Sequence, residues 1–330
     1  MHKNIHFSTG IEEQYHQDVL NFVKDWNSNK DEIIVQTSGS TGTPKTIRLK
    51  KSAVKKSALA TGKFFDFKVG QKTILNLSPN YIAGKLMIVR ALVFDMELYV
   101  LPNSRNPLLD FDFEDLDFAA FVPYQVDAIL NNPQTRTRFN KIRNVIIGGA
   151  PINRDLERRL LGCDNQSFAS FGMTETITHF ALRSINEKHQ YYTCLPGFKV
   201  TTNKNNGLVL EKNAITNKLE TNDWVELLDD SRFIWKGRLD HIINSGGIKL
   251  SPETLERKIA DELLHRRFYF IGRPSEKFGE ELILYVEGPE MDDLADRIKP
   301  FLAKYELPKS IYFVPVFKET PTGKVKRVLF

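Results

Sequence analysis

Two hydrophobic patterns alternate along the first 190 residues of the chain. One is a spacing of three or four residues between apolar positions, typical of an amphipathic helix, first seen from Ile11 to Trp26. The other is a short apolar run, typical of a buried strand. Together they predict helices over residues 11–26, 52–65, 82–94, 124–131 and 153–161, and strands over 33–36, 73–77, 97–101, 118–122, 144–148 and 167–171. This alternation predicts an α/β sheet with crossover helices.

The pattern changes after about residue 190. Four strand-like runs, GFKV, GLVLE, WVELL and RFIWKG, follow one another with no helix between them, which predicts a β-rich antiparallel region. A helix signal returns at Ser251, because serine is a good N-cap and Pro252 suits the first helical position. Further strands at RFYFIG, ELILYVEG and SIYFVP, with a helix near residues 291–303 between the last two, complete an α+β unit.

We therefore expect two domains in the 330 residues. The first is a large N-terminal α/β domain with the β-rich region at its end, residues 1–238. The second is a small, mobile C-terminal α+β domain, residues 239–330. The boundary lies in the GRLD segment, residues 237–240.

Composition and charge exclude several classes of protein. Hydrophobic residues make up 41% and charged residues 26%, which is close to the globular average and unlike a disordered or fibrous chain. The net charge of +5 is small and evenly spread, so no nucleic-acid partner is expected, although a phosphate-bearing small molecule is allowed. Cys163 and Cys194 have no metal-ligand spacing and are expected to be reduced thiols. Without an apolar leader or a long apolar run, we expect a cytoplasmic protein with no membrane span.

Residues 37–45, TSGSTGTPK, concentrate groups that bind anions. Glycines let backbone N–H groups approach an anion, hydroxyl groups donate hydrogen bonds and lysine adds a positive charge. The segment is not a Walker loop, because its lysine follows Pro44 and the next residues alternate as a strand. We expect a loop that links two strands and closes over phosphates, the alternative being a flexible turn. Its binding residues would be Thr37, Ser38, Gly39, Ser40, Thr41, Gly42 and Lys45.

Three more segments follow this loop in a characteristic order. They are SFGMTET at 170–176, WKGRLDHIINSGGIKLSPETLE at 235–256 and PTGKVKR at 321–327. Together with the loop, they resemble the motifs of the adenylate-forming enzymes, which include acyl- and aryl-CoA synthetases, luciferases and peptide-synthetase adenylation domains. The resemblance covers about residues 30–330. Within this family, the segment SGGIKLSPETLE and the compact C-terminal half look most like the o-succinylbenzoate–CoA ligases of menaquinone synthesis.

This resemblance implies a two-step reaction that uses ATP, Mg²⁺, CoA and a small carboxylic acid. The acid first attacks the α-phosphate of ATP, and a thiol then displaces AMP from the acyl-adenylate. Lys324 matches the family's adenylation lysine, whose charge would stabilise the transition state at the α-phosphate. Glu175 matches the carboxylate that holds Mg²⁺, a cation that prefers oxygen ligands, and Thr174 matches a donor to the α-phosphate.

The same resemblance assigns an adenine site. Gly148, Gly149 and Ala150 follow a predicted strand at the sheet edge where α/β folds bind ligands, and they match the family's segment beside adenine. Read alone, they are ordinary turn residues. Phe171 stands where the family usually has tyrosine, which preserves stacking on the base and loses a hydroxyl contact.

Further matches lie around the expected domain boundary. Asp223 matches the aspartate that accepts both ribose hydroxyls, and Arg238 matches a second ribose contact. Asp240 matches the hinge about which the C-terminal domain turns between the two steps. Gly246 and Gly247 would then leave room for the pantetheine arm of CoA.

The chain departs from the family pattern in two places. The phosphate loop begins near the start of the chain, whereas the family usually has well over a hundred residues before it, so most of an N-terminal subdomain is expected to be missing. The segment that lines the acyl pocket reads SPNYIAGKLMIVRAL, in which Tyr81 and Gly84 fit the pattern but the usual histidine is absent. Lys85 and Arg90 stand nearby on a predicted helix.

These two cations suggest a substrate with a second carboxylate. o-Succinylbenzoate has two carboxylates, and the one that is not activated would need a charged partner inside a pocket. Lys85 and Arg90 are candidates, with solvated helix charges as the alternative. His179 could line the same pocket, with a packed or capping histidine as the alternative.

Two other functions stay open at this point. One is an adenylation enzyme for another aryl or acyl acid, or for a carrier-protein thiol. The other is a nucleotide-binding homologue without turnover, which the short N-terminal region suggests. The presence of Lys324, Glu175 and Asp223 argues against the second.

Overall fold

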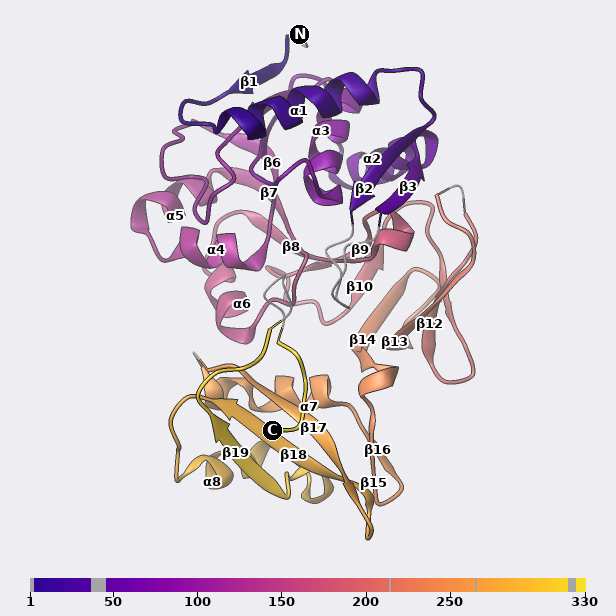
Figure 1. Ribbon diagram of the computed structural model, residues 1–330, viewed down its shortest axis with the longest axis vertical. Coiled ribbons are helices and arrows are strands. Elements are labelled where there is room, and N and C mark those ends of the chain that lie inside the picture. Colours follow the sequence, from indigo (N-terminus) through magenta and orange to yellow (C-terminus); the bar gives the residue numbers. More distant parts are fainter. Residues whose placement is uncertain (1–2, 37–45, 214, 265, 320–324) are drawn as a thin grey trace. The chain divides into compact units, whose positions relative to one another are not determined.

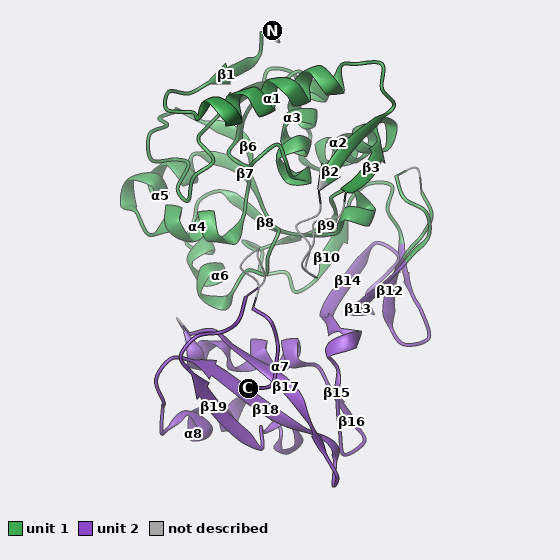
Figure 2. Ribbon diagram, in the orientation of Figure 1, with its two compact units in different colours: residues 1–39, 43–199, 210–219 green, residues 40–42, 200–209, 220–330 purple. Residues whose placement is uncertain are grey.

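The computed structural model describes residues 3–36, 46–213, 215–264, 266–319 and 325–330. The chain forms two compact units (Figure 2). Unit 1 comprises Met1–Gly39, Thr43–Lys199 and Leu210–Leu219, and unit 2 comprises Ser40–Gly42, Val200–Val209 and Glu220–Phe330. The mixed α/β architecture expected from the sequence is confirmed. The domain boundary after residue 238 stays a prediction, since the units group the preceding strands with the C-terminal region.

Unit 1 is built on a mostly parallel sheet (Figure 1). Six parallel strands run in the order β1-β5-β4-β6-β7-β8, and β9 and β10 extend the sheet in antiparallel fashion. Their bounds are β1 Ile5–Phe7, β4 Lys72–Leu75, β5 Glu97–Val100, β6 Leu116–Phe121, β7 Ile142–Ile147, β8 Gln166–Gly172, β9 His179–Ser184 and β10 Tyr192–Cys194.

Six helices connect these strands, and most of them agree with the predicted ranges. They are α1 Glu13–Trp26, α2 Lys51–Phe65, α3 Ile82–Phe94, α4 Pro123–Leu130, α5 Pro133–Asn140 and α6 Arg154–Leu160. Apolar residues of α4, α5 and α6 pack against β4, β6 and β7 in one core cluster. Helix α3 is different, because Gly84–Ala91 are buried without a break. A helix buried on all sides hides any charge that it carries.

Unit 2 contains two sheets. The first has the strand order β14-β13-β12-β11, with bounds β11 Val200–Thr202, β12 Gly207–Leu210, β13 Leu219–Leu227 and β14 Arg232–Arg238. The second contains β15 Ile243–Ser245, β16 Ile248–Leu250, β17 Phe268–Ser275, β18 Gly279–Glu287 and β19 Ser310–Val314. Helices α7 Pro252–Ile259 and α8 Leu294–Ile298 contribute to the core of this second sheet.

The predicted start of α7 is confirmed in detail. Ser251 is the N-cap, and its Oγ accepts a hydrogen bond from the Thr254 backbone N–H at 3.2 Å. Pro252 occupies the first helical position, where its missing N–H costs nothing. The predicted helix over 291–303 is shorter than expected: α8 ends at Ile298 and a 3-10 turn, Lys299–Phe301, follows.

Candidate active site

The expected phosphate loop joins the two strands of a separate ribbon in unit 1. β2 Glu32–Gln36 and β3 Thr46–Lys50 pair antiparallel, and Gln36 pairs with Thr46 at the ends nearest the loop. The prediction that the loop links two strands is therefore confirmed. The binding residues Thr37, Ser38, Gly39, Ser40, Thr41, Gly42 and Lys45 lie outside the described residues, so their role stays a prediction.

The adenine-site residues lie where two neighbouring parallel strands end. Gly148 to Ala150 follow β7, and Phe171 lies near the end of β8. A Cβ on Gly148 would lie 2.0 Å from Ser170 Oγ, so glycine here leaves room for that side chain. Gly149 has φ +84°, which favours glycine. These residues therefore lie at the carboxyl edge of two neighbouring parallel strands, and their role in binding adenine stays a prediction.

Phe171 is fixed by other aromatic rings. Its ring meets Phe180 edge-to-face at 5.6 Å and Tyr192 at 5.2 Å between centroids. A register shift separates Phe171 from Gly172, where β8 meets β9. These two contacts fix the orientation of the Phe171 ring.

The turn after β8 presents Thr174 and Glu175 and is clamped by Thr176. The Thr176 hydroxyl accepts from the Met173 N–H at 3.1 Å and lies 2.6 Å from the Thr178 carbonyl oxygen, to which it donates. Ile177 has φ +70°, a region that β-branched residues rarely adopt. Local strain of this kind clusters at functional sites, and no sequence pattern predicts it here.

Glu175 suits one ligand position of a magnesium ion. Its side chain is exposed, and no described residue binds its carboxylate. Mg²⁺ in nucleotide sites is typically held by one or two carboxylates together with phosphate oxygens, not by a protein cage. Accordingly, no group of three or more His, Cys, Asp and Glu residues in the described ranges could hold a metal.

Arg90 is buried without a polar partner strong enough to balance its charge. It is 2% exposed, and its Nε and Nη2 atoms have no hydrogen-bond partner among the described residues. Nη1 lies 3.5 Å from Met87 Sδ, and the guanidinium stands 6.0 Å from the centre of the Phe118 ring. Burial lowers the pKa of Arg90 to about 9. The alternative of a solvated charge is therefore wrong for Arg90.

Polar groups of α2 and β9 surround the same region. His179, 5% exposed, lies with Nε2 3.4 Å from the Thr61 hydroxyl, and burial together with the charge of Arg90 lowers its pKa well below the usual value. One turn earlier on α2, the buried Ser57 hydroxyl donates to no described residue. His179 lies beside both Thr61 and Arg90, so these groups together offer donors and positive charge to an anion.

Lys85 lies in different surroundings. It is 9% exposed, and its ammonium group donates to the Pro79 carbonyl and stands 4.7 Å from the centre of the Phe22 ring in α1. Burial lowers its pKa. A solvated charge is wrong here too, but five helical residues separate Lys85 from Arg90, which places the two side chains on different faces of α3.

Two other pocket candidates differ in exposure. Tyr81 is the N-cap of α3 and is half exposed, at 50%. Gly84 lies in the first turn, where a Cβ would be 2.3 Å from the Ser78 carbonyl oxygen. Close backbone packing alone therefore requires glycine at this position.

In unit 2, Asp223 is buried and already holds one partner. It is 8% exposed, and its Oδ1 accepts a hydrogen bond from the Trp235 indole N–H at 2.9 Å. Arg238 lies directly across the β13–β14 pair from Asp223. Its guanidinium binds the hinge candidate Asp240 through two hydrogen bonds, at 2.8 and 2.9 Å. The two ribose candidates and the hinge candidate thus lie together at one end of β14.

The start of α7 packs onto the same strand end. The hydroxyls of Ser251 and Thr254 both donate to the Lys236 carbonyl, at 2.6 and 2.8 Å. His241 and Glu253 lie 2.5 Å apart from Nδ1 to Oε1. A Cβ on Gly237 would lie 2.5 Å from both Ser251 Oγ and Glu253 Oε2, so this close contact depends on glycine.

Gly246 and Gly247 form the two-residue turn between β15 and β16. Their φ angles are +58° and +83°, as a type I′ hairpin requires, and Ser245 pairs with Ile248 across the turn. No heavy atom lies within 4 Å of a Cβ built on Gly247. The hairpin by itself explains both glycines, and their place in CoA binding stays a prediction.

Lys324 lies outside the described residues, but its flanks are anchored. Glu319 pairs with Val325, and the Lys326 N–H donates to the Lys318 carbonyl at 2.8 Å. Arg327 binds Glu256 of α7 through two hydrogen bonds, one of 2.8 Å from Nη2 to Oε2. The segment matching the adenylation motif is thus tied to α7 on its C-terminal side.

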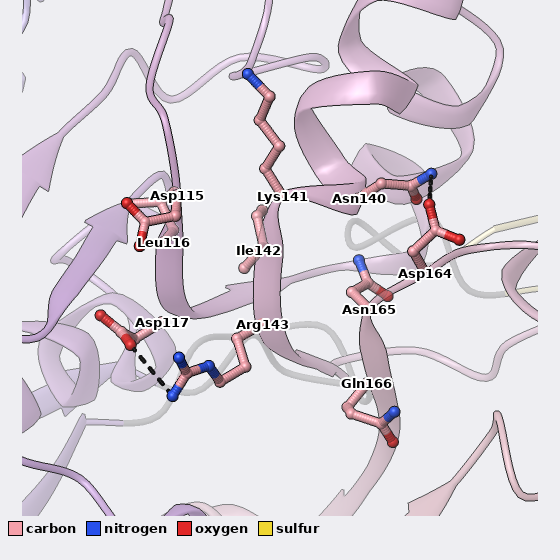
Figure 3. A pocket seen from close by; sticks show the side chains of 10 residues that line it. All are labelled: Asp115, Leu116, Asp117, Asn140, Lys141, Ile142, Arg143, Asp164, Asn165 and Gln166. Atoms are coloured by element: carbon pink, nitrogen blue, oxygen red, sulfur yellow. Dashed lines mark hydrogen bonds and ion pairs between the residues drawn. The ribbon is translucent and has the colours of Figure 1, made fainter.

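A cavity of about 330 Å³ lies at the opposite edge of the unit 1 sheet (Figure 3). Its lining includes Leu116, Ile142 and Gln166, the first residues of β6, β7 and β8. Two pairs of its side chains bind each other: Arg143 with Asp117 at 3.8 Å and Asn140 with Asp164 at 3.0 Å. It is therefore separate from the carboxyl edge.

In the described part of the chain, no helix is long and apolar enough to cross a membrane.

Comparison with known proteins shows which sequences and folds this chain resembles. The chain is 32% identical to the acyl-CoA synthetase (AMP-forming)/AMP-acid ligase II-like protein from Dyadobacter fermentans, with a TM-score of 0.68, covering 97% of this chain and 94% of that one. It is 24% identical to a 2-succinylbenzoate–CoA ligase of Haemophilus influenzae, covering 92% of this chain and 73% of the relative. The fold matches o-succinylbenzoate coenzyme A synthetase of Bacillus subtilis in complex with ATP and magnesium ion, at 18% identity and a TM-score of 0.74, covering 88% of this chain and 68% of that one. The family described as AMP-binding enzyme matches residues 8–203, more than half of the chain. The chain therefore belongs to the AMP-binding enzyme family and is an AMP-forming ligase of the adenylate-forming group.

Proposed function

We propose that this ligase activates a carboxylic acid with ATP and transfers the acyl group to CoA. In the first step, a carboxylate oxygen of the acid attacks the α-phosphorus of ATP, and pyrophosphate leaves. In the second, the sulfur of CoA attacks the acyl carbon, AMP leaves and the thiol proton passes to solvent. The family membership supports this reaction, and ATP, Mg²⁺ and CoA are its expected cofactors.

Some of the candidate residues would bind the nucleotide, and others would act at the reacting phosphate. Phe171 and the Gly148–Ala150 turn would receive adenine at the carboxyl edge, and Asp223 with Arg238 would bind the ribose. Thr174 and Lys324 would contact the α-phosphate, where negative charge builds up in the transition state. Glu175 would hold Mg²⁺, which neutralises phosphate charge when it is bound.

The acid that we propose is o-succinylbenzoate, converted to o-succinylbenzoyl-CoA in menaquinone synthesis. The observation that carries this choice is Arg90, a buried cation whose Nε and Nη2 lack described partners. An unpaired buried charge is costly, and a substrate carboxylate would supply the missing acceptor. Ser57, Thr61 and His179 could donate to the same carboxylate or line its site. The names of the relatives from H. influenzae and B. subtilis point to the same acid.

A pyrophosphate-release assay with ATP and Mg²⁺ tests the reaction and the acid separately. o-Succinylbenzoate should be used with a far higher kcat/KM than 3-benzoylpropionate, which lacks the ring carboxylate. Addition of CoA should yield the thioester and AMP. Turnover of fatty or simple aryl acids with no preference for the dicarboxylate would contradict the choice of acid. No pyrophosphate release with any acid would contradict ligase activity itself.

A further inference from the structure

The carboxylate of Asp223 is held by a tryptophan on the neighbouring strand. The Trp235 indole nitrogen donates to Asp223 Oδ1 at 2.9 Å. Asp223 is 8% exposed, so this bond is protected from competition with water. Arg238, directly opposite Asp223 in the strand pair, is bound to Asp240. Among the described residues, Trp235 is the one donor to the Asp223 side chain.

An irregularity in the β13–β14 pair makes this contact geometrically possible. Asp223 pairs with Arg238 and Trp224 with Gly237, but Val225 pairs with Trp235, so Lys236 is an extra residue in β14. Residues that face each other across a strand pair share one face of the sheet, and so do residues two apart on one strand. Val225 therefore shares a face with Asp223, and Trp235 joins them there.

If the strand pair kept a regular register beyond Trp224, Trp235 would lie on the other face. In regular antiparallel pairing, Lys236 would oppose Val225 and Trp235 would oppose Glu226, so the indole would point away from Asp223. Bulges of this kind re-aim a side chain next to functional sites. The bulge therefore places the indole N–H of Trp235 where it can donate to Asp223.

The bond leaves the carboxylate free to accept more hydrogen bonds in a fixed direction. A carboxylate has about four acceptor positions, and the indole occupies one of them. The indole is rigid, and the Trp235 carbonyl is fixed in turn by Arg257 Nη2 at 3.1 Å. A carboxylate held in one rotamer can meet two hydroxyls of a ligand without first losing rotational freedom.

From this geometry we infer that Trp235 is a positioning residue for ribose recognition: its N–H fixes the Asp223 carboxylate for the two ribose hydroxyls of ATP. The inference rests on the proposed role of Asp223 in the nucleotide site. Trp235 itself touches neither the nucleotide nor the reacting atoms.

The test compares Trp235→Phe with wild type in binding ATP and 2′,3′-dideoxy-ATP by titration calorimetry. Phenylalanine keeps an aromatic ring and removes only the donor. We expect the variant to bind ATP roughly threefold to tenfold more weakly, the effect of one hydrogen bond, and to bind dideoxy-ATP as wild type does. The control is Trp26→Phe, because Trp26 lies in α1 of unit 1 and packs on Phe22. Both affinities should be unchanged in that control.

The outcomes separate this inference from the function on which it rests. If Trp235→Phe weakens the binding of ATP and of dideoxy-ATP equally, Trp235 only supports the strand. If the binding of both nucleotides is unchanged, the hydrogen bond from Trp235 to Asp223 does not contribute to recognition. Either result overturns the inference while the nucleotide site survives. Wild-type protein that binds ATP and dideoxy-ATP equally would remove Asp223 from ribose recognition, and Trp235 with it.

A second measurement decides the matter if Trp235→Phe does not fold. Wild-type protein labelled with ¹⁵N has three indole N–H groups, one for each tryptophan. Trp26→Phe and Trp224→Phe assign the remaining signal to Trp235. ATP should shift that signal and dideoxy-ATP should leave it in place. Equal shifts with both nucleotides would overturn the inference.

Discussion

Arg238 and Asp240 bind each other through two hydrogen bonds, Nε to Oδ1 at 2.8 Å and Nη2 to Oδ2 at 2.9 Å. The pairing raises the pKa of Arg238 and lowers the pKa of Asp240. The sequence motifs predict different roles for the two residues: ribose binding for Arg238 and hinge rotation for Asp240. Since one guanidinium would serve both, the proposed ribose contact of Arg238 would compete with its pairing to Asp240.

Removing the hinge carboxylate should therefore help the nucleotide to bind. We expect Asp240→Asn to tighten ATP binding by up to about fivefold, because exposed ion pairs contribute only about 0 to 1 kcal/mol. Calorimetric titration with ATP measures this. Asp229→Asn is the matched control, since Asp229 pairs with Arg232 at 2.7 Å at the start of the same strand. Unchanged or weaker ATP binding in Asp240→Asn would show that Asp240 does not restrain Arg238.

Lys324 and Gly246 should affect opposite halves of the reaction. Lys324→Ala should slow adenylate formation about a hundredfold or more, the scale of losing one transition-state donor, and spare thioester formation from a synthetic acyl-adenylate. Gly246→Asn should do the reverse. Asparagine tolerates the positive φ at this turn position, so it adds a side chain without breaking the hairpin. Separate assays of the two half-reactions measure both effects, and equal damage to both halves in each variant would contradict a domain rotation.

Arg90→Met should lose substrate affinity and gain stability. The KM for a dicarboxylate should rise about tenfold or more, as expected for a lost charged hydrogen bond, while that for 3-benzoylpropionate stays constant. The ligand-free variant should melt at a higher temperature, since an apolar chain replaces an unpaired buried charge. Lys85→Met is the control, because Lys85 contacts Pro79 and Phe22 instead. A fall in melting temperature with unchanged KM would assign Arg90 a structural role.

Gly237→Ala should lower the free energy of unfolding by more than alanine at a glycine whose Cβ would meet no neighbouring atom. At Gly237, φ is +144° and a Cβ would lie 2.5 Å from Ser251 Oγ and Glu253 Oε2. Gly70 also has a positive φ, +76°, but nothing lies within 4 Å of its Cβ. We expect a loss of about 2 kcal/mol or more at Gly237 and about 1 kcal/mol at Gly70, measured by urea unfolding. Equal losses would mean that α7 can move away from the strand at no cost.

His179 should make the stability depend on pH on the acidic side. Its pKa in the folded protein lies well below 6.5 because of burial and the nearby Arg90 charge. Below that usual value the unfolded chain binds a proton that the folded protein excludes, so the free energy of unfolding decreases as pH falls. The slope approaches about 1.4 kcal/mol per pH unit, and it vanishes above about pH 7, where both states are neutral. His179→Gln should flatten this part of a urea-unfolding series between about pH 7 and 5, whereas parallel wild-type and variant curves would contradict the prediction.

Most of unit 1 could be predicted because its elements are long and apolar. Four elements of unit 1 were missed: the helix α5 and the strands β1, β9 and β10. β1 has three residues, Ile5–Phe7, too few to form a recognisable pattern. α5, Pro133–Asn140, buries only Thr135 and Phe139, so it lacks an apolar stripe. Its usable signal was Asn132, which caps the helix, followed by Pro133 at the first position.

The sequence motifs indicated candidate site residues but not their surroundings. Motifs indicated Asp223, but the partner Trp235 depends on a bulge that no local pattern announces. Lys85 and Arg90 looked equivalent along the sequence, since a solvated helix and a helix buried on all sides can carry the same charges. Thr176 holds the turn that presents Glu175. Apart from its position in the motif, the sequence shows no feature that predicts this role.

The isolation of Arg90 has an evolutionary consequence. A residue that makes no strong bond to its own protein in the ligand-free state is not required by the fold. If Arg90 binds the second carboxylate of the proposed acid, a change at position 90 to an apolar residue would leave the packing of α3 supported by its neighbours and remove the preference for an anion. In the lineage of this protein, the charge of the accepted acid would then drift faster than the architecture that activates it, and ancestral variants at this one position would mark where the preference arose.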